Sequence, residues 1–343
     1  MREVKHYLSQ NIVKLLSWNV RGPKAPNKQN EVTFPCNKEK IGLIGLLETN
    51  IKSSRIDQIA NKIFGGWHYI TNLESHYNGR IWILWRSDYF NVTLIERTTQ
   101  VVTCEVKYIP MQVEFMVSFV YAFNTSEGKR ELWNKLTQQK IRYDKPWLIL
   151  GDFNAVLRVD NRCDGVLVTL AEVAEFQSCI DTCELLELPN QGQRYTWNDK
   201  HEGERIFSKI DWAFINKEWL DTIPPSTNRY LTEGISDHCP TIIEIEEAAV
   251  RVRNSFQYCN AWAEYPNFKE KVKSTWDMEI DGYKMFQVVQ KMKILKKGLK
   301  ELNSQHFRNI VLEVNIDREA LKGAQIKMQT DPMNTELQNK EKE

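Results

Sequence analysis

The sequence predicts an α/β (α+β) fold in which two β-sheets form a sandwich flanked by helices, followed by a C-terminal helical hairpin. Short apolar runs that end in polar residues recur between residues 12 and 246, and their length is that of buried strands. They form two groups separated by amphipathic segments, which is typical of packed sheets covered by helices. From about Phe256 a heptad-like helical spacing follows. We therefore expect one domain over residues 1–250 and a helical, partly coiled-coil-like segment over residues 251–343.

The composition indicates a folded protein rather than a disordered one. Of the 343 residues, 42% are hydrophobic and 11% aromatic, which is enough for a substantial core. No apolar run approaches the length of a membrane span, and residues 1–10 lack the apolar stretch of a secretory signal. Seven scattered cysteines form no C-x-x-C pair, so no disulfide framework is expected. These features predict an intracellular protein without a membrane partner.

The first half of the chain contains a run of expected strands. An apolar run over Ile12–Ser17 is followed by Asn19, and a second run over Ile41–Leu47 ends in Glu48. Apolar residues at helical spacing predict a helix over residues 53–64. Closely spaced strands without helices between them favour antiparallel pairing. We expect such strands over Trp67–Thr71, Arg80–Trp85, Val92–Ile95, Val101–Val106 and Met111–Ala122.

A strand over Pro146–Leu157 is the most informative stretch of the chain. Its apolar run stops at Gly151, and Asp152 and Asn154 follow at alternating positions. Residues two apart in an extended segment face the same side, so a carboxylate and a carboxamide would point together. Taken alone, these residues also fit an ordinary turn. The first domain is completed by helices over 126–141 and 171–186, a strand over Arg205–Ile215 that carries Ser208 and Asp211, and a loop entering a strand over residues 236–246.

Eight polar residues at these strand ends together indicate an active site. Taken singly, each has a simpler explanation: Tyr121 can be core, Asp211 a salt-bridge partner and His238 a loop histidine. Their accumulation at strand ends, with a histidine directly after an aspartate, favours a site that carries chemistry. The eight residues are Asn19, Glu48, Tyr121, Asp152, Asn154, Asp211, Asp237 and His238.

The local sequences around these residues resemble the signature boxes of the endonuclease/exonuclease/phosphatase superfamily, in the same order and spacing. The boxes are Trp18-Asn19, Leu47-Glu48-Thr49, Gly151-Asp152-Phe153-Asn154, Ser208-Lys209-Ile210-Asp211 and Ser236-Asp237-His238. The flanking residues are most similar to the endonuclease of plant LINE-type (non-LTR) retrotransposons, and the likeness covers roughly residues 12–247. One loop, Asp160–Gly165, departs from the tighter turn of those relatives, which affects the expected substrate contacts more than the chemistry.

The resemblance implies a deoxyribonuclease I-like fold and a metal site. Glu48 would ligate a divalent cation, with Asn19 and Asp237 close to it. Hard oxygen ligands suit Mg²⁺, with Mn²⁺ as an alternative. The metal would activate a water or stabilise the leaving oxygen.

The resemblance also assigns catalytic roles. Asp152, helped by Asn154, would position or deprotonate the attacking water. His238, oriented by Asp211, would donate a hydrogen bond to the scissile phosphate. Tyr121 would contact the phosphate or the leaving oxygen, and Ser208 is a further candidate for phosphate contact.

These roles predict a DNA-nicking phosphodiester hydrolase of retrotransposon origin that leaves a 3′-hydroxyl. DNA would be the substrate, a reverse transcriptase supplied in trans would extend the nick, and a nuclear location follows from the substrate. One alternative is a catalytically inactive retroelement relic or nucleic-acid-binding module. A more distant alternative is a phosphoesterase for small molecules, whose additional sequence boxes we do not find.

The C-terminal segment resembles the region that such elements place before their reverse transcriptase, on the basis of Asn260-Ala261-Trp262 and a lysine-rich helix. Its apolar residues follow heptad-like spacing and predict two helices folded as a hairpin, with self-association through residues 288–328 as an alternative to DNA contact. Six lysines without an acidic residue lie within 284–300. A solvated helix face explains them more simply than a phosphate-binding surface does. The heptad-like positions are Val288, Met292, Leu295, Leu299, Leu302, Ile310, Val314, Leu321, Ala324 and Met328.

Overall fold

The computed structural model describes residues 13–22, 26–75, 79–201, 203–246, 263, 266–281, 284–302, 320–332 and 334–342. The chain divides into two compact units, one formed by Met1–Arg251 with Lys322–Glu343 and the other by Val252–Leu321. This grouping differs from a division at residue 250, because residues 322–342 bond to loops of the first unit at Tyr195 and Gly203.

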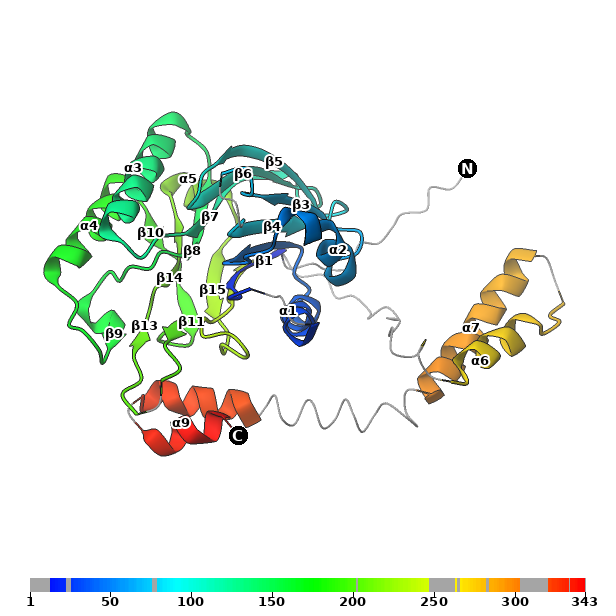
Figure 1. Ribbon diagram of the computed structural model, residues 1–343. Helices are drawn as coiled ribbons and strands as arrows, with labels where there is room; N and C mark the ends of the chain where they lie inside the picture. Colours follow the sequence, from blue (N-terminus) through cyan, green and yellow to red (C-terminus); the bar gives the residue numbers. More distant parts are fainter. Residues whose placement is uncertain are drawn as a thin grey trace. The chain divides into compact units, whose positions relative to one another are not determined.

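The first unit contains two mixed sheets that pack face to face, which confirms the predicted sandwich (Figure 1). One sheet has seven strands in the order β11 (Asn190–Gly192), β15 (Ser226–Tyr230), β16 (Thr241–Ile245), β1 (Val13–Asn19), β2 (Leu43–Leu47), β4 (Ile81–Trp85) and β3 (His68–Thr71).

The second sheet has six strands, and a small third sheet lies beside it. The six strands follow the order β10 (Leu186–Glu187), β14 (Asp211–Ile215), β8 (Trp147–Asp152), β7 (Val113–Tyr121), β6 (Val101–Tyr108) and β5 (Phe90–Arg97). As expected from their close spacing in the sequence, β5, β6 and β7 pair antiparallel. The small sheet consists of β12 (Trp197–Asn198), β13 (Phe207–Ser208) and β9 (Arg162–Cys163).

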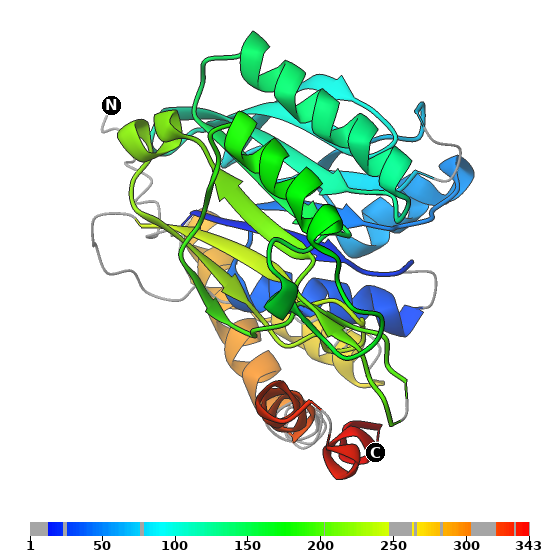
Figure 2. The ribbon, with the colours of Figure 1, turned by 90° about the vertical axis from the view of Figure 1, so that its left-hand side faces the viewer.

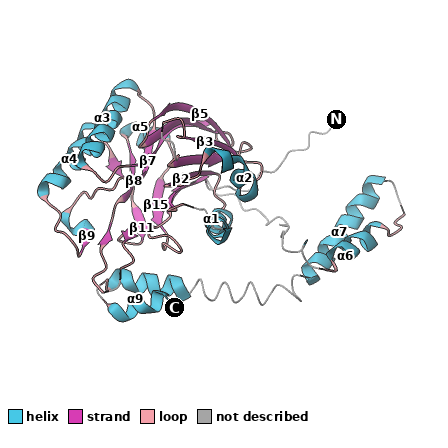
Figure 3. Cartoon of the chain, viewed as in Figure 1, coloured by secondary structure: helices cyan, strands magenta, loops and turns pink. Residues whose placement is uncertain are grey.

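Helices cover the outer faces of the two large sheets (Figure 3). On the six-stranded sheet, α3 (Ser126–Arg142) and α4 (Leu170–Thr182) pack through Trp133 and Phe176, whose rings stack with centroids 4.7 Å apart. On the seven-stranded sheet, α1 (Pro26–Glu39) and α2 (Ser53–Ile63) contribute a separate apolar cluster. A short helix, α5 (Lys217–Thr222), follows β14.

The main core lies between the two sheets and explains why their strands are so apolar. Residues such as Leu15 and Leu43 on one sheet face Phe119 and Leu150 on the other, and all four are fully buried. Both faces of each large sheet are therefore covered, which favours continuous apolar runs over alternating ones. This layering leaves the strand ends as the places where polar side chains reach solvent.

Two predicted strands are shorter or broken in the structure. The expected strand Pro146–Leu157 ends as β8 at Asp152, because Asn154 turns away with φ +46°, outside the extended range. The expected strand Arg205–Ile215 is two strands, β13 and β14, in different sheets. The helix α1 was not predicted, since its sequence has weak amphipathic spacing and contains Pro35.

The second unit contains the helices α6 (Phe268–Trp276) and α7 (Lys284–Leu302). They pack through Phe268, Leu295, Leu299 and Leu302, so three positions of the predicted heptad seam, Leu295, Leu299 and Leu302, make an intramolecular contact. The helical character of the C-terminal region is confirmed. The expected seam positions Ile310 and Val314, and Asn260–Trp262, lie outside the described residues. No helix among the described residues combines the length and apolar character that a membrane crossing needs.

Candidate active site

Strand register brings three of the predicted site residues to the same level of the six-stranded sheet. Tyr121 at the end of β7 pairs with Asp152 at the end of the parallel strand β8. Asp152 in turn pairs with Asp211, the first residue of the antiparallel strand β14. Because β14 runs opposite to β8, its beginning lies beside the end of β8. A tyrosine and two aspartates therefore share one edge of this sheet.

The seven-stranded sheet brings its polar strand ends to the same place. Asn19 ends β1 and pairs with Leu47, the last residue of the parallel strand β2, so Glu48 follows directly beyond it. Glu48 leaves the strand with φ +51°. The amide of Asn19 donates from Nδ2 to Asp152 Oδ2 over 2.9 Å. This hydrogen bond joins the two sheets at the site.

His238 lies just before β16, the antiparallel neighbour of β1, and faces two carboxylates. Its Nδ1 is 3.0 Å from Asp211 Oδ2, and its Nε2 is 3.7 Å from Asp152 Oδ2. All three side chains are at most 3% exposed. Burial lowers the pKa of His238, but Asp211 and Asp152 outweigh it and raise that pKa to about 9. The imidazole is therefore a cation near neutral pH, with Nδ1 directed at Asp211.

Burial acts in the opposite direction on the neighbouring acids. It raises the pKa of Asp152 above the usual range, although His238 and the hydrogen bond from Asn19 oppose it. Burial, together with Glu48 and Asp152, raises the pKa of Tyr121 far above its ordinary value. Tyr121 is thus a neutral phenol that can donate a hydrogen bond, while Asp152 has increased basicity.

The loop that carries His238 is held in place by three hydrogen bonds. Ser236 Oγ donates to the carbonyl of Asn19 over 2.7 Å and accepts from the amide of His238 over 3.2 Å. The indole of Trp18 donates to the carbonyl of His238 over 2.8 Å. The loop is therefore fixed to the end of β1.

Asn154 reaches the site by a turn rather than by continuing the strand. The sequence predicted that it would face the same side as Asp152 in an extended segment. In the structure its left-handed backbone lets its amide donate to Asp152 Oδ1 over 3.0 Å, while its side chain donates to the carbonyl of Ala122. The two polar side chains still line one cavity.

The oxygen atoms of Glu48, Asp237 and Asn19 lie around one positively charged group, as the ligands of a divalent cation would. The guanidinium of Arg21 lies 2.9 Å from Asp237 Oδ2 and 3.7 Å from Glu48 Oε2. One cationic group thus reaches both carboxylates, and Asn19 Oδ1 accepts from the backbone amide of Arg21. Oxygen donors arranged around a positive charge fit a hard cation such as Mg²⁺.

A second group of possible ligands, Asp152, Asp211 and His238, has its donor atoms within 4.8 Å of one another. This group is fully buried, and His238 Nδ1 is already bonded to Asp211. Mg²⁺ prefers oxygen and retains several waters. The partly exposed acids Glu48 and Asp237, with 23% and 12% side-chain exposure, are therefore the better fit.

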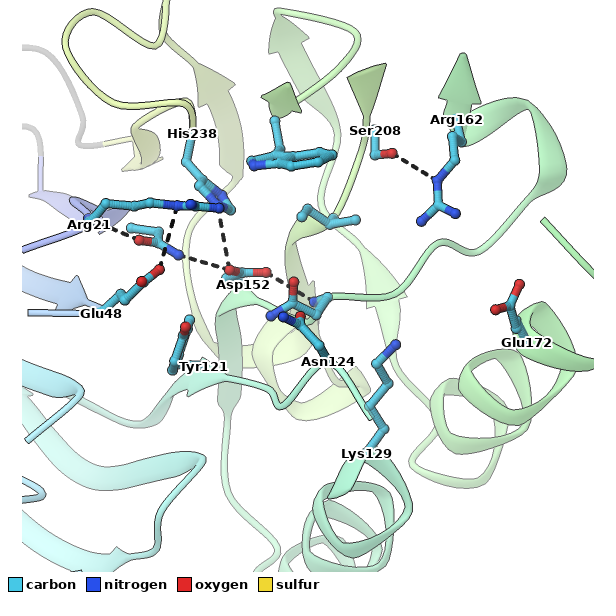
Figure 4. Close-up of a pocket in the computed structure, with 14 residues that line it drawn as sticks. Arg21, Glu48, Tyr121, Asn124, Lys129, Asp152, Arg162, Glu172, Ser208 and His238 are labelled. Atoms are coloured by element: carbon cyan, nitrogen blue, oxygen red, sulfur yellow. Dashed lines mark hydrogen bonds and ion pairs between the residues drawn. The ribbon is translucent and has the colours of Figure 1, made fainter. Parts of the chain in front are cut away.

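A cavity of about 460 Å³ lies over these residues (Figure 4). Asp152 lies in its middle, with Arg21, Glu48 and His238 on one side and Lys129 and Arg162 on the other. Asp211 and Asp237 are not on the cavity lining and contact it through His238 and Arg21. The predicted residues that line it are Asn19, Glu48, Tyr121, Asp152, Asn154, Ser208 and His238.

Sequence reasoning missed the outer part of this lining. Ser208 is buried and accepts a hydrogen bond from Arg162 Nε over 3.0 Å, and Arg162 lines the cavity as well. Arg162 lies within the loop that departs from the plant pattern, which was the available signal. The other missed residues are Arg21, Asn124, Lys129, Glu172, Trp197 and Ile210.

The two-sheet sandwich with an acidic, histidine-containing site at its strand ends defines a deoxyribonuclease I-like phosphoesterase fold. Residues 16–238 match the Endonuclease/Exonuclease/phosphatase family, and the chain belongs to this family. Members of this family are hydrolases that act as nucleases or phosphatases, generally with divalent metals. No curated protein matches the chain.

Solved structures with the same fold include two nucleases. The endonuclease domain of TRAS1, a telomere-specific non-LTR retrotransposon, is 15% identical with a TM-score of 0.53, covering 69% of this chain and 100% of that domain. The AP endonuclease LMAP from Leishmania major is 13% identical with a TM-score of 0.55, covering 69% of this chain and 88% of that protein. At these identities the likeness establishes the shared fold.

Proposed function

We propose that this protein is a divalent-metal-dependent phosphodiester hydrolase that nicks DNA, leaves a 3′-hydroxyl and derives from a retrotransposon. The observation that carries the proposal is the convergence of the His238–Asp211 pair, Asp152 and the acid Glu48 on one cavity. The similarity to a retrotransposon endonuclease supports the choice of DNA as substrate.

Asp152 is the proposed general base. Its Oδ1 accepts from the Asn154 amide and its Oδ2 from the Asn19 side chain, so its orientation is fixed before substrate arrives. A raised pKa makes it more able to take a proton from an attacking water. Asn154, whose side-chain nitrogen Nδ2 donates to the carbonyl of Ala122, retains its side-chain oxygen for holding that water.

His238 and Tyr121 are the proposed donors to the phosphate. Protonated His238 can donate from Nε2 to a non-bridging oxygen as negative charge builds there. Asp211 fixes the orientation and the charge of the imidazole through the 3.0 Å contact to Nδ1. Glu48, Asp237 and Asn19 would hold Mg²⁺, with Mn²⁺ as an alternative, and the ion would supply charge stabilisation for the leaving 3′-oxygen.

The outer wall of the cavity suits a polyanion. Lys129 on α3 and Arg162 on β9 place positive charge there (Figure 4), and Trp197 also lines the cavity. Cationic side chains position a nucleic-acid backbone, and an aromatic face can stack on a base. We infer that the DNA strand runs between this wall and Asp152.

A plasmid-nicking assay with the full chain tests the proposal. We expect supercoiled plasmid to be nicked with Mg²⁺ and to stay intact with EDTA, and His238→Ala to lose activity by at least about 10²-fold. His201→Ala is the matched control, since that side chain is 79% exposed and does not line the cavity. A polymerase should extend the nick without prior phosphatase treatment, because the product carries a 3′-hydroxyl.

The other outcomes separate the alternatives. Folded protein that binds DNA without nicking it would favour an inactive relic acting as a nucleic-acid-binding module. Hydrolysis of inositol phosphates with no action on plasmid would favour the small-molecule phosphoesterase. Extension of nicked plasmid by an added reverse transcriptase with an RNA template would support a reverse transcriptase as the partner in trans.

A molecular mass that rises with protein concentration in light scattering would support self-association through residues 288–328. A nuclear location is part of the same proposal, and fluorescence of the tagged full chain in cells tests it.

A further inference from the structure

The C-terminal residues of the first unit bind its loops through glutamine side chains. Gln329 accepts from the backbone amide of Tyr195 over 2.9 Å and donates to the carbonyl of the same residue over 3.2 Å. Gln338 makes the same pair of contacts with Gly203, at 3.1 Å and 3.2 Å. Each glutamine thus satisfies both polar groups of one loop residue, as a neighbouring strand would.

A third glutamine repeats the arrangement on the loop that leads to His238. Gln325 accepts from the amide of Gly234 and donates to its carbonyl, both at 3.4 Å. Gln325 and Gln338 are each only 1% exposed. Glutamine is seldom so buried without full hydrogen bonding, so these contacts account for the burial.

An apolar contact and a buried ion pair anchor the same residues. Met328 is fully buried against Tyr195 and Phe207. Glu341 Oε2 lies 2.9 Å from Arg205, whose side chain is completely buried. Removing a partner from a buried ion pair leaves an uncompensated charge, which is strongly destabilising. Residues 322–332 and 334–342 are therefore an integral part of this unit. They include α9 (Thr335–Lys342), whose Leu337 packs in the same cluster as Phe207 of β13. The C-terminal helices, in red, lie below the strands of the sandwich in both views (Figures 1 and 2).

The bound loops carry residues of the candidate active site. Tyr195 and Gly203 flank β12 and its turn to β13, which bear Trp197 and Ser208. Gly234 lies four residues before His238.

Direct bonds connect the β12 segment to the catalytic loop. Cys239 donates from its amide to the carbonyl of Thr196 over 2.7 Å, and Asn198 donates to the carbonyl of Asp237 over 3.1 Å. The indole of Trp197 also donates to Asp237 Oδ2 over 2.9 Å. A displacement of the clamped loops would therefore move Asp237 and its neighbour His238.

We propose that residues 322–342 form a C-terminal clamp, in which Gln325, Gln329 and Gln338 are positioning residues for the active site. They set the backbone of the loops that present Trp197 and His238. The role in catalysis rests on the proposed nuclease function, whereas the positioning of the loops does not.

The test uses full-length chain carrying Gln329→Met and Gln338→Met together, which keeps side-chain size and removes the four hydrogen bonds to Tyr195 and Gly203, together with the bond from Gln338 to the carbonyl of Pro332. Lys327→Met is the matched control, since Lys327 is exposed on the same helical stretch. Circular dichroism checks folding, and the single variant Gln338→Met replaces the double variant if that does not fold. Amide hydrogen exchange and the kinetics of plasmid nicking are then measured.

We expect exchange at the amides of Tyr195 and Gly203 to accelerate at least about tenfold. Exchange at Asn198 and Cys239, which no glutamine contacts, should accelerate as well. For nicking, kcat should fall roughly tenfold with little change in KM, because a small displacement acts on the reacting geometry. The control should match the parent in both measurements.

Two results would overturn the clamp. Equal exchange at Tyr195 and Gly203 in the variant and the parent would mean that the segment does not bind these loops. Acceleration confined to these two amides, with Asn198 and Cys239 unchanged, would mean that binding does not position the active site. If the parent itself fails to nick plasmid, the nuclease proposal fails, while the exchange data still decide on the clamp.

Discussion

Gly151, the residue before Asp152, allows β7 and β8 to pair at the centre of the site. Its φ of +138° is one that L side chains rarely adopt. A Cβ at this position would lie 2.1 Å from the carbonyl oxygen of Val120 on the neighbouring strand. Since that atom belongs to the backbone of a buried strand, it can move away only by opening the sheet. We therefore predict that Gly151→Ala strongly destabilises the protein.

The magnitude follows from two contributions. Backbone strain of this kind costs about 1–3 kcal/mol, and overpacking of a well-packed interior costs about 1–3 kcal/mol. Together they predict a loss of about 2–6 kcal/mol in the free energy of unfolding, a large share of the roughly 5–15 kcal/mol typical of a domain. Gly66→Ala is the control, because Gly66 has φ +84° but nothing within 4 Å of the added carbon. It should lose only the strain, about 1 kcal/mol.

Urea unfolding followed by tryptophan fluorescence measures both variants against the parent. The reasoning predicts a midpoint for Gly151→Ala well below that of Gly66→Ala. If the two variants unfold at the same denaturant concentration, the close approach of β7 and β8 does not constrain this position. The explanation of why the apolar run stops at a glycine would then be wrong.

Three further predictions concern chemistry and pH. Asp211→Asn should lower kcat for nicking about 10²-fold in single-turnover kinetics, since it removes the carboxylate that holds His238; an unchanged rate would refute that role. Burial raises the pKa of Glu341, but Lys200 and Arg205 outweigh it, so the net pKa lies below 4.5. Its stabilisation is complete above about pH 4.5 and is lost as pH falls through the lowered value. The melting temperature of the parent should exceed that of Glu341→Gln above that pH and approach it below, and a difference that stays constant with pH would contradict this. EDTA should abolish nicking and added Mg²⁺ restore it, as plasmid gels would show.

The residues at strand ends could be predicted because the apolar run of a buried strand stops where the strand ends. The apolar runs before Asn19, Glu48 and Asp152 stop where the structure ends β1, β2 and β8. A polar group directly after such a run must lie at the edge of the sheet, where it can meet solvent or a partner. Local sequence therefore carries enough information to place these residues at one end of their own strands.

The pairing that brings the strands together could not be predicted in this way. The register between Asp152 and Asp211 joins residues far apart in the chain, and the break between β13 and β14 depends on which sheet each strand joins. Likewise, Lys129 reaches the cavity from a helix whose sequence alone gives a typical amphipathic pattern. Such positions follow from tertiary packing, which overrides local preference.

For the C-terminal residues, too, the sequence predicted which residues are buried but not which part of the chain they contact. Heptad-like spacing placed Ala324 and Met328 on an apolar helix face, and both are indeed buried, at 5% and 0% exposure. The spacing gave no partner for that face, and Met328 packs on Tyr195 and Phe207 of the sandwich unit. Periodicity identifies the face that is buried, whereas the structure shows that the glutamines beside it bond to the backbone amides and carbonyls of Tyr195, Gly203 and Gly234. A glutamine beside an apolar helix face needs a hydrogen-bonding partner when it is buried, so it adds to the stripe the expectation of a polar contact.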